Sequence, residues 1–183
     1  MRTERIARYV VPVVQGVVGV EWFRAGWEKL TSGDFPAGMG KTLGAFAAHN
    51  PTGWYRDFLT GTAMPNATAF GYVIEWGELL AGAGLIIAAV ALLVWGTGAS
   101  AVTAQAVSGL ALLAGTFMSW NFWFAAGWTS ASTDSANYVM GLVQLVLLGS
   151  AIAALVMAWR VRTPAVKAVV PVAKPHTTSI GHA

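Results

Sequence analysis

Cysteine is absent from this chain of 183 residues, and charged residues make up only 10% of it. Without cysteine, the chain forms no disulfide and offers no thiolate as a nucleophile or metal ligand. Only three histidines are present, and two of them lie near the carboxyl end. We therefore expect no metal, haem or flavin in this chain. Soluble domains carry about 25% charged residues, and 56% of this chain is hydrophobic, so the composition indicates a membrane protein.

The basic residues gather at the two ends of the chain. Three arginines lie within the first eight residues, and a second basic group begins at Arg160. No face of interleaved basic and aromatic residues connects them, so a nucleic-acid partner is not expected. Segments rich in lysine and arginine stay in the cytoplasm. The sequence therefore predicts a multi-pass protein of the cell inner membrane, with both termini in the cytoplasm.

Four stretches are long and apolar enough to cross a bilayer, which takes roughly 20 residues. They are residues 9–30, 68–95, 102–127 and 135–159. We predict an all-α fold, an integral membrane four-helix bundle over residues 1–162. Residues 163–183 contain three prolines and no apolar periodicity, which predicts a disordered cytoplasmic tail.

The segment from Thr31 to Ala67 is too polar to span the bilayer and too long to be a simple turn. Apolar residues recur in it at helical spacing, first around Leu43 and Phe46 and then around Trp54 and Phe58. This spacing predicts short amphipathic helices on the outer surface of the membrane.

Charged residues within the predicted spans cost roughly 2.5–3.5 kcal/mol each, so they are candidate functional residues. The first span contains Glu21 and Arg24, and the second contains Glu75 and Glu78. With a rise of about 1.5 Å per residue, the two pairs lie at similar depths below the outer boundary. We therefore predict that Arg24 forms an ion pair with Glu75 or Glu78. In the alternative interpretation, such a pair only holds two helices together.

Two further residues of the first span, Glu28 and Lys29, lie close to its outer end. Long charged side chains at this position commonly extend to the membrane interface. We predict this interfacial placement for both of them.

Aromatic residues are concentrated at the same end of the spans. Trp76 adjoins Glu75, and Trp120 adjoins Asn121, so these residues are expected to line a pocket. An exchangeable carboxyl beside aromatic rings suits a quinone, whose reduction takes up protons together with electrons. The alternative is an ordinary belt of tryptophans at the membrane interface.

Three segments resemble the DoxD/DoxX family. Residues 22–30 (WFRAGWEKL) resemble its first-helix signature, in which an aromatic pair precedes a Gly-aromatic-x-Lys-Leu ending. Residues 77–82 (GELLAG) are similar to its second-helix pattern, and Asn121-Phe122 to the end of its third helix. The resemblance implies a DoxD-type membrane subunit of a thiosulfate:quinone oxidoreductase. It also implies a small DoxA-like partner subunit.

The predicted function is thiosulfate oxidation coupled to quinone reduction, with quinone as the substrate. Glu78, Glu75 and Arg24 are the candidate catalytic residues. The candidate quinone-binding residues are Trp76, Trp120, Asn121 and Glu21. A non-catalytic membrane anchor for a soluble redox enzyme is the first alternative, and a small-solute transporter is the second. Partners other than the bilayer would be a redox subunit or a second copy of the chain.

Overall fold

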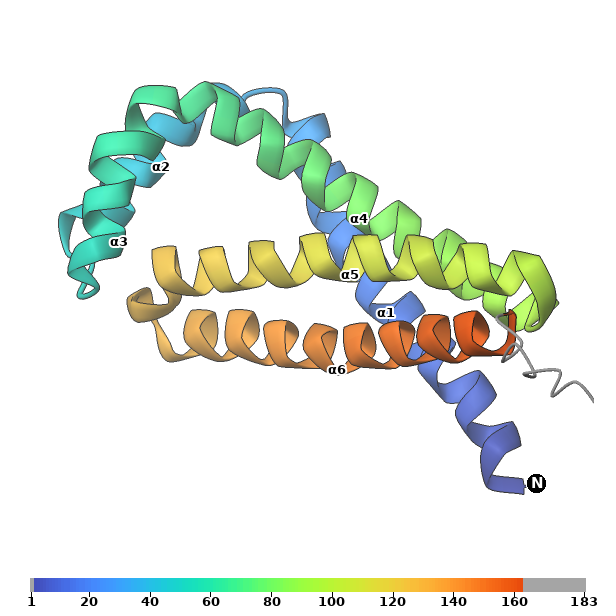
Figure 1. Ribbon diagram of the computed structural model, residues 1–183. Helices are drawn as coiled ribbons and strands as arrows, with labels where there is room; N and C mark the ends of the chain where they lie inside the picture. Colours follow the sequence, from blue (N-terminus) through green and yellow to red (C-terminus); the bar gives the residue numbers. More distant parts are fainter. Residues whose placement is uncertain (1, 163–183) are drawn as a thin grey trace, which may run out of the picture.

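The computed structural model describes residues 2–162, which form helices and no strand (Figure 1). Four helices are long: α1 (Arg2–Ser32), α4 (Ala67–Trp95), α5 (Gly98–Ala126) and α6 (Ala131–Arg162). The short elements α2 (Phe35–Ala48), α3 (Gly53–Phe58), a π turn (Leu59–Ala63) and a 3-10 turn (Met64–Asn66) lie between α1 and α4. A second 3-10 turn, Gly127–Thr129, joins α5 to α6. The predicted tail, 163–183, lies outside the described residues.

The all-helical prediction is confirmed for the described residues. Three helical stretches among them are long and apolar enough to cross a membrane: Gly53–Trp95, Gly98–Thr129 and Ala131–Val161. The first stretch has 43 residues, about twice what a crossing requires, and Figure 1 shows the chain turning between α3 and α4. Helix α1 is not one of the three.

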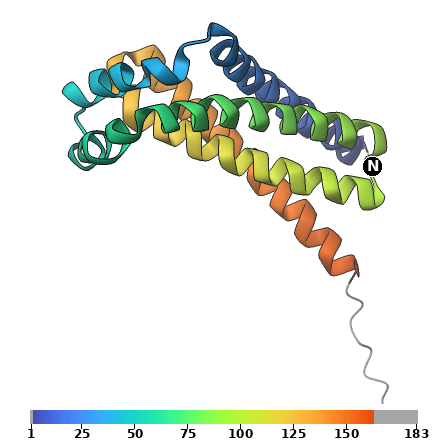
Figure 2. The ribbon, with the colours of Figure 1, turned by 90° about the horizontal axis from the view of Figure 1, so that it is seen from above.

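The two ends of the described chain lie on the same side of the molecule. In Figures 1 and 2, the start of α1 and the end of α6 lie toward the connection between α4 and α5. Helices α2 and α3 lie at the opposite end. The α4–α5 connection is only two residues long, because Gly96 takes a left-handed conformation with φ of 43° and ends α4 abruptly.

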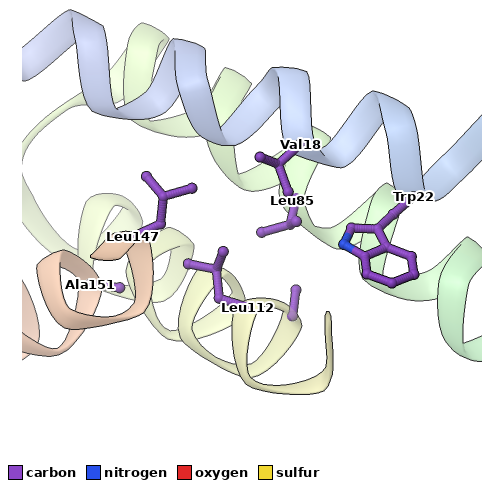
Figure 3. Close-up of a cluster of buried hydrophobic side chains, with 7 residues drawn as sticks. Val18, Trp22, Leu85, Leu112, Leu147 and Ala151 are labelled. Carbon is purple, nitrogen blue, oxygen red and sulfur yellow. The ribbon is translucent and has the colours of Figure 1, made fainter. Parts of the chain in front are cut away.

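The central core lies between the four long helices. Val18 and Trp22 of α1, Leu85 of α4, Leu112 of α5 and Leu147 of α6 point toward one another in it (Figure 3). A second cluster lies at the α2–α3 end, where Met39, Leu43, Ala47, Tyr55, Leu59, Ala63 and Ala125 are buried together. The amphipathic helices predicted for this segment are therefore present, and their apolar sides pack on the protein itself.

Helices α1 and α4 approach each other closely along glycines. A Cβ atom on Gly82 of α4 would lie only 2.6 Å from Phe23 Cα of α1. A Cβ atom on Gly26 of α1 would lie 2.8 Å from Leu79 Cα of α4. Small residues permit this backbone-to-backbone packing between membrane helices. The two glycines thus fix the register of α1 along α4.

Candidate functional site

A buried ion pair joins α1 to α4 near the α2 end of the molecule. The Lys29 Nζ atom lies 2.7 Å from Glu78 Oε2. The Glu78 side chain is only 2% exposed, and that of Lys29 is 25% exposed. The same ammonium lies 5.3 Å from the centre of the Phe35 ring, at the start of α2. Three helices therefore meet at Lys29 of α1. Its ammonium group pairs with the Glu78 carboxylate of α4 and lies over the Phe35 ring of α2.

Glu75 lies on the same side of α4 as Glu78, slightly less than one turn away. It is 4% exposed. No hydrogen bond or ion pair from the described residues reaches its carboxyl group. A carboxyl group in this position, with no partner among the described residues, is available to bind a ligand. We refer to Glu75, Glu78 and Lys29 together as the Glu75–Glu78 site.

The predicted pairing of Arg24 with Glu75 or Glu78 is wrong. The Arg24 guanidinium lies 2.9 Å from the Glu21 carboxylate of its own helix. Their side chains are 67% and 49% exposed, on the surface of α1 that faces away from the core. Arg24 and Glu21 are therefore not part of the Glu75–Glu78 site.

The error lies in the register of α1 against α4. Depths counted from the outer ends of the first two predicted spans placed Glu21 at the same level as Glu78. In the structure Gly26 faces Leu79, so α1 is displaced along α4 by about six residues, or about 9 Å. The displacement brings Lys29, for which an interfacial position was predicted, to Glu78. Glu28 is exposed, as expected for an interfacial residue.

The other predicted site residues do not join Glu75 and Glu78. Trp76 is 46% exposed on the outer surface of α4. Trp120 packs edge-on against Trp123 and against Tyr138 of α6, with ring centres 5.7 Å and 5.6 Å away. The carbonyl and side-chain oxygens of Asn121 accept hydrogen bonds from the Tyr55 hydroxyl of α3, at 3.0 Å and 3.2 Å. Trp120 and Asn121 thus join α5 to α6 and to α3.

A second polar cluster connects three long helices within the core. Trp22 Nε1 of α1 donates a hydrogen bond to Gln144 Oε1 of α6, at 3.0 Å. Gln144 Nε2 donates in turn to the Ser119 hydroxyl of α5, at 2.8 Å. Gln144 is completely buried, and Ser119 is 1% exposed. Among the described residues, the buried hydroxyls of Ser108 and Thr116 have no hydrogen-bond partner.

The two polar clusters lie at the same height along the helices. Close approaches between neighbouring helices fix their relative heights: Gly26 at Leu79, Gly77 at Met118 and Gly115 at Gln144. Glu78 therefore lies level with the hydrogen bonds of Gln144. Polar side chains from all four long helices, namely Lys29, Glu78, Ser119 and Gln144, thus lie near one level.

Sequence reasoning missed Lys29, Trp22 and Tyr55 as residues of these polar clusters. For Lys29 a signal was present, since it belongs to the segment that resembles the first DoxD/DoxX helix. For Trp22 the signal was its helical spacing of seven residues from Lys29, which sets both on one face of α1. For Tyr55 the sequence offers no specific signal.

Two apolar surface grooves occur away from the Glu75–Glu78 site. One, of about 400 Å³, lies between α1 and α4 and is lined by residues such as Val17 and Ile86. The other, of about 300 Å³, lies between α4 and α5. Neither groove is lined by Glu75 or Glu78. In the described part of the chain, no group of three or more His, Cys, Asp or Glu residues could hold a metal ion.

Comparisons of the chain with protein-family models, with curated proteins and with solved structures found no match.

Proposed function

We propose that this chain is a membrane subunit of a quinone-linked oxidoreductase and that the Glu75–Glu78 site exchanges protons with the quinone. The observation that carries the proposal is Glu75, a residue only 4% exposed, whose carboxyl group has no hydrogen bond or ion pair among the described residues and which lies within one helical turn of Glu78. Acidic side chains within membrane-spanning segments are rare and commonly mark functional sites.

The proposal includes α1 as a fourth membrane crossing, with both termini in the cytoplasm and α2 and α3 outside. Helix α1 has 31 residues, enough to cross, and packs mainly against α4, which lies within one of the three apolar stretches. An even number of crossings agrees with the two ends of the described chain lying on one side. In this arrangement, the Glu75–Glu78 site lies in the outer half of the membrane.

The chemistry assigned to the site is limited to protons. Each quinone that is reduced takes up two electrons and two protons. The DoxD/DoxX resemblance implies thiosulfate as the electron donor, and two thiosulfate ions release two electrons when they join as tetrathionate. In this scheme Glu75 passes protons to the quinone. Lys29 pairs with Glu78 and keeps α1 and α2 against α4.

The DoxD/DoxX resemblance also supports assigning Lys29 and Glu78 to one site. Lys29 lies in the Gly-aromatic-x-Lys-Leu ending of the first segment, and Glu78 lies in the Gly-Glu pattern of the second. These two residues, 49 positions apart in the sequence, form the buried ion pair. A contact between the two resembling segments is what a shared functional site requires.

The test compares Glu75→Gln with Glu78→Gln in purified protein, with two measurements on each preparation. Glutamine preserves shape but carries no exchangeable carboxyl proton. We expect Glu75→Gln to retain its thermal stability and to lose quinone reduction by roughly a hundredfold or more. Glu78→Gln leaves the Lys29 ammonium without its partner and is expected to lose up to about 3–5 kcal/mol of stability.

Asp134→Asn is the matched control, because Asp134 is an exposed carboxylate at the start of α6. It should change neither measurement greatly. Unchanged thiosulfate-dependent quinone reduction per folded molecule in Glu75→Gln would contradict the proton-exchange role. The site would then be structural, and the chain would fit the alternative role of a non-catalytic anchor for a soluble redox enzyme.

A further inference from the structure

The surface of α1 that faces away from the core combines charge with an apolar row. Glu21 and Arg24 are exposed there, within the segment that we propose to cross the membrane. Charged side chains inside a bilayer almost always face protein or a water-filled cavity instead of lipid. In a single copy of this chain, the described residues leave both side chains uncovered. A protein partner on this surface would cover both side chains.

The row itself has the spacing of a helix–helix seam. Alternating steps of three and four residues connect Val10, Val13, Val17, Val20, Arg24 and Trp27. All six are exposed. Alternating steps of this kind place side chains along one seam, where they insert between the side chains of a facing helix. A single charged residue in such a seam fixes the register of the two helices.

The neighbouring surface provides room for a second helix. The groove of about 400 Å³ between α1 and α4 is lined by Val13, Val17, Val20 and Glu21 from α1, and by Ile86 and Val90 from α4. Its lining is mostly aliphatic, with Glu21 as its one charged member. The groove thus adjoins the row of six residues on α1, and Val13, Val17 and Val20 belong to both.

We propose that two copies of this chain associate through this surface of α1, with Arg24 of each copy paired to Glu21 of the other. Two-fold symmetry about an axis normal to the membrane sets the two α1 helices parallel and level. Arg24 then lies three residues, or about 4.5 Å along the axis, from the second copy's Glu21. The charges are complementary under this symmetry, and the same patch serves both copies, as in most homodimers.

This inference depends on α1 crossing the membrane and not on the quinone chemistry. Arg24 and Glu21 lie outside the Glu75–Glu78 site, so the dimer can be tested without any measurement of activity. A result that contradicts the dimer therefore does not bear on the proposed proton exchange. A result that contradicts the proton exchange likewise does not bear on the dimer.

The first test uses cysteines introduced into this chain of 183 residues, which has none of its own. Val17→Cys lies in the middle of the row, and Val146→Cys on α6 is a matched control with 74% exposure. After mild oxidation of membranes, Val17→Cys should form a disulfide-linked dimer and Val146→Cys should not. Equal cross-linking of both variants, or none at Val17→Cys, would overturn the proposal.

The second test reverses charges in the Val17→Cys background. Arg24→Glu makes positions 21 and 24 both acidic in each copy, and Glu21→Arg makes both basic. Because like charges then face each other across the interface, each variant alone should lose most of its cross-linking. Co-expressed with different tags, the two variants should cross-link preferentially with each other and restore the dimer. Cross-linking that is indifferent to both reversals would overturn the assigned pairing. Matched thermal stability of the variants confirms that each is folded.

Discussion

The close packing of α1 on α4 predicts that Gly82→Ala destabilises the protein. The added Cβ atom would lie 2.6 Å from Phe23 Cα and 2.7 Å from Gly19 O, and both of these are backbone atoms. The Phe23 backbone nitrogen would lie closer still, so restoring an ordinary contact of 3.4 Å requires the helices to separate by more than about 0.8 Å at this point. Added methyl groups in well-packed interiors cost about 1–3 kcal/mol, and the upper part of that range is expected because backbone cannot rotate away.

The assay is thermal unfolding in detergent, with Gly109→Ala as the matched control. Gly109 lies in α5, and nothing lies within 4 Å of a Cβ atom placed on it. This control should stay within about 1 kcal/mol of the parent protein, since alanine is the better helix former. Equal stability of Gly82→Ala and Gly109→Ala would show that α1 does not pack on α4 in this register.

Two further predictions concern the core and the topology. Trp22→Phe removes the hydrogen-bond donor to Gln144 and leaves the buried amide oxygen of Gln144 without its partner. The free energy of unfolding should therefore fall by about 1–3 kcal/mol. Trp76→Phe, at the surface, should change it little. Ser32→Cys should react with an impermeant thiol reagent in intact cells, and Thr97→Cys should not. Ser32 ends α1, whereas Thr97 lies in the α4–α5 connection at the opposite end of the molecule. Labelling of Thr97→Cys alone would reverse the proposed orientation.

The sequence predicted individual helices well because their signals are local. The second predicted span, 68–95, agrees with α4 within one residue at its start and at its end. There a long apolar run is followed by Gly96, which favours the left-handed conformation that ends the helix. The predicted ends of the other three spans differ from the structure by one to seven residues, the largest difference being at the start of α1.

The candidate site was predicted only in part, because it depends on how two helices are registered. Burial of Glu75 and Glu78 on one face of α4 follows from their spacing, and the structure agrees. Their partner could not be derived by counting residues from the assumed membrane boundaries. The register is determined by backbone contacts at Gly26 and Gly82, which place Lys29, and not Arg24, at Glu78. Such contacts depend on the tertiary fold and leave no periodic signal in the sequence.

The ion pair between Lys29 and Glu78 is tested most directly by a double-mutant cycle of stability. Lys29→Met or Glu78→Met alone leaves a buried charge without a partner, and each should cost up to about 3–5 kcal/mol. The double variant replaces both charges by apolar side chains, so it should be more stable than either single variant. Losses in the double variant equal to the sum of the two single losses would show that Lys29 and Glu78 do not interact, and would contradict the site described here.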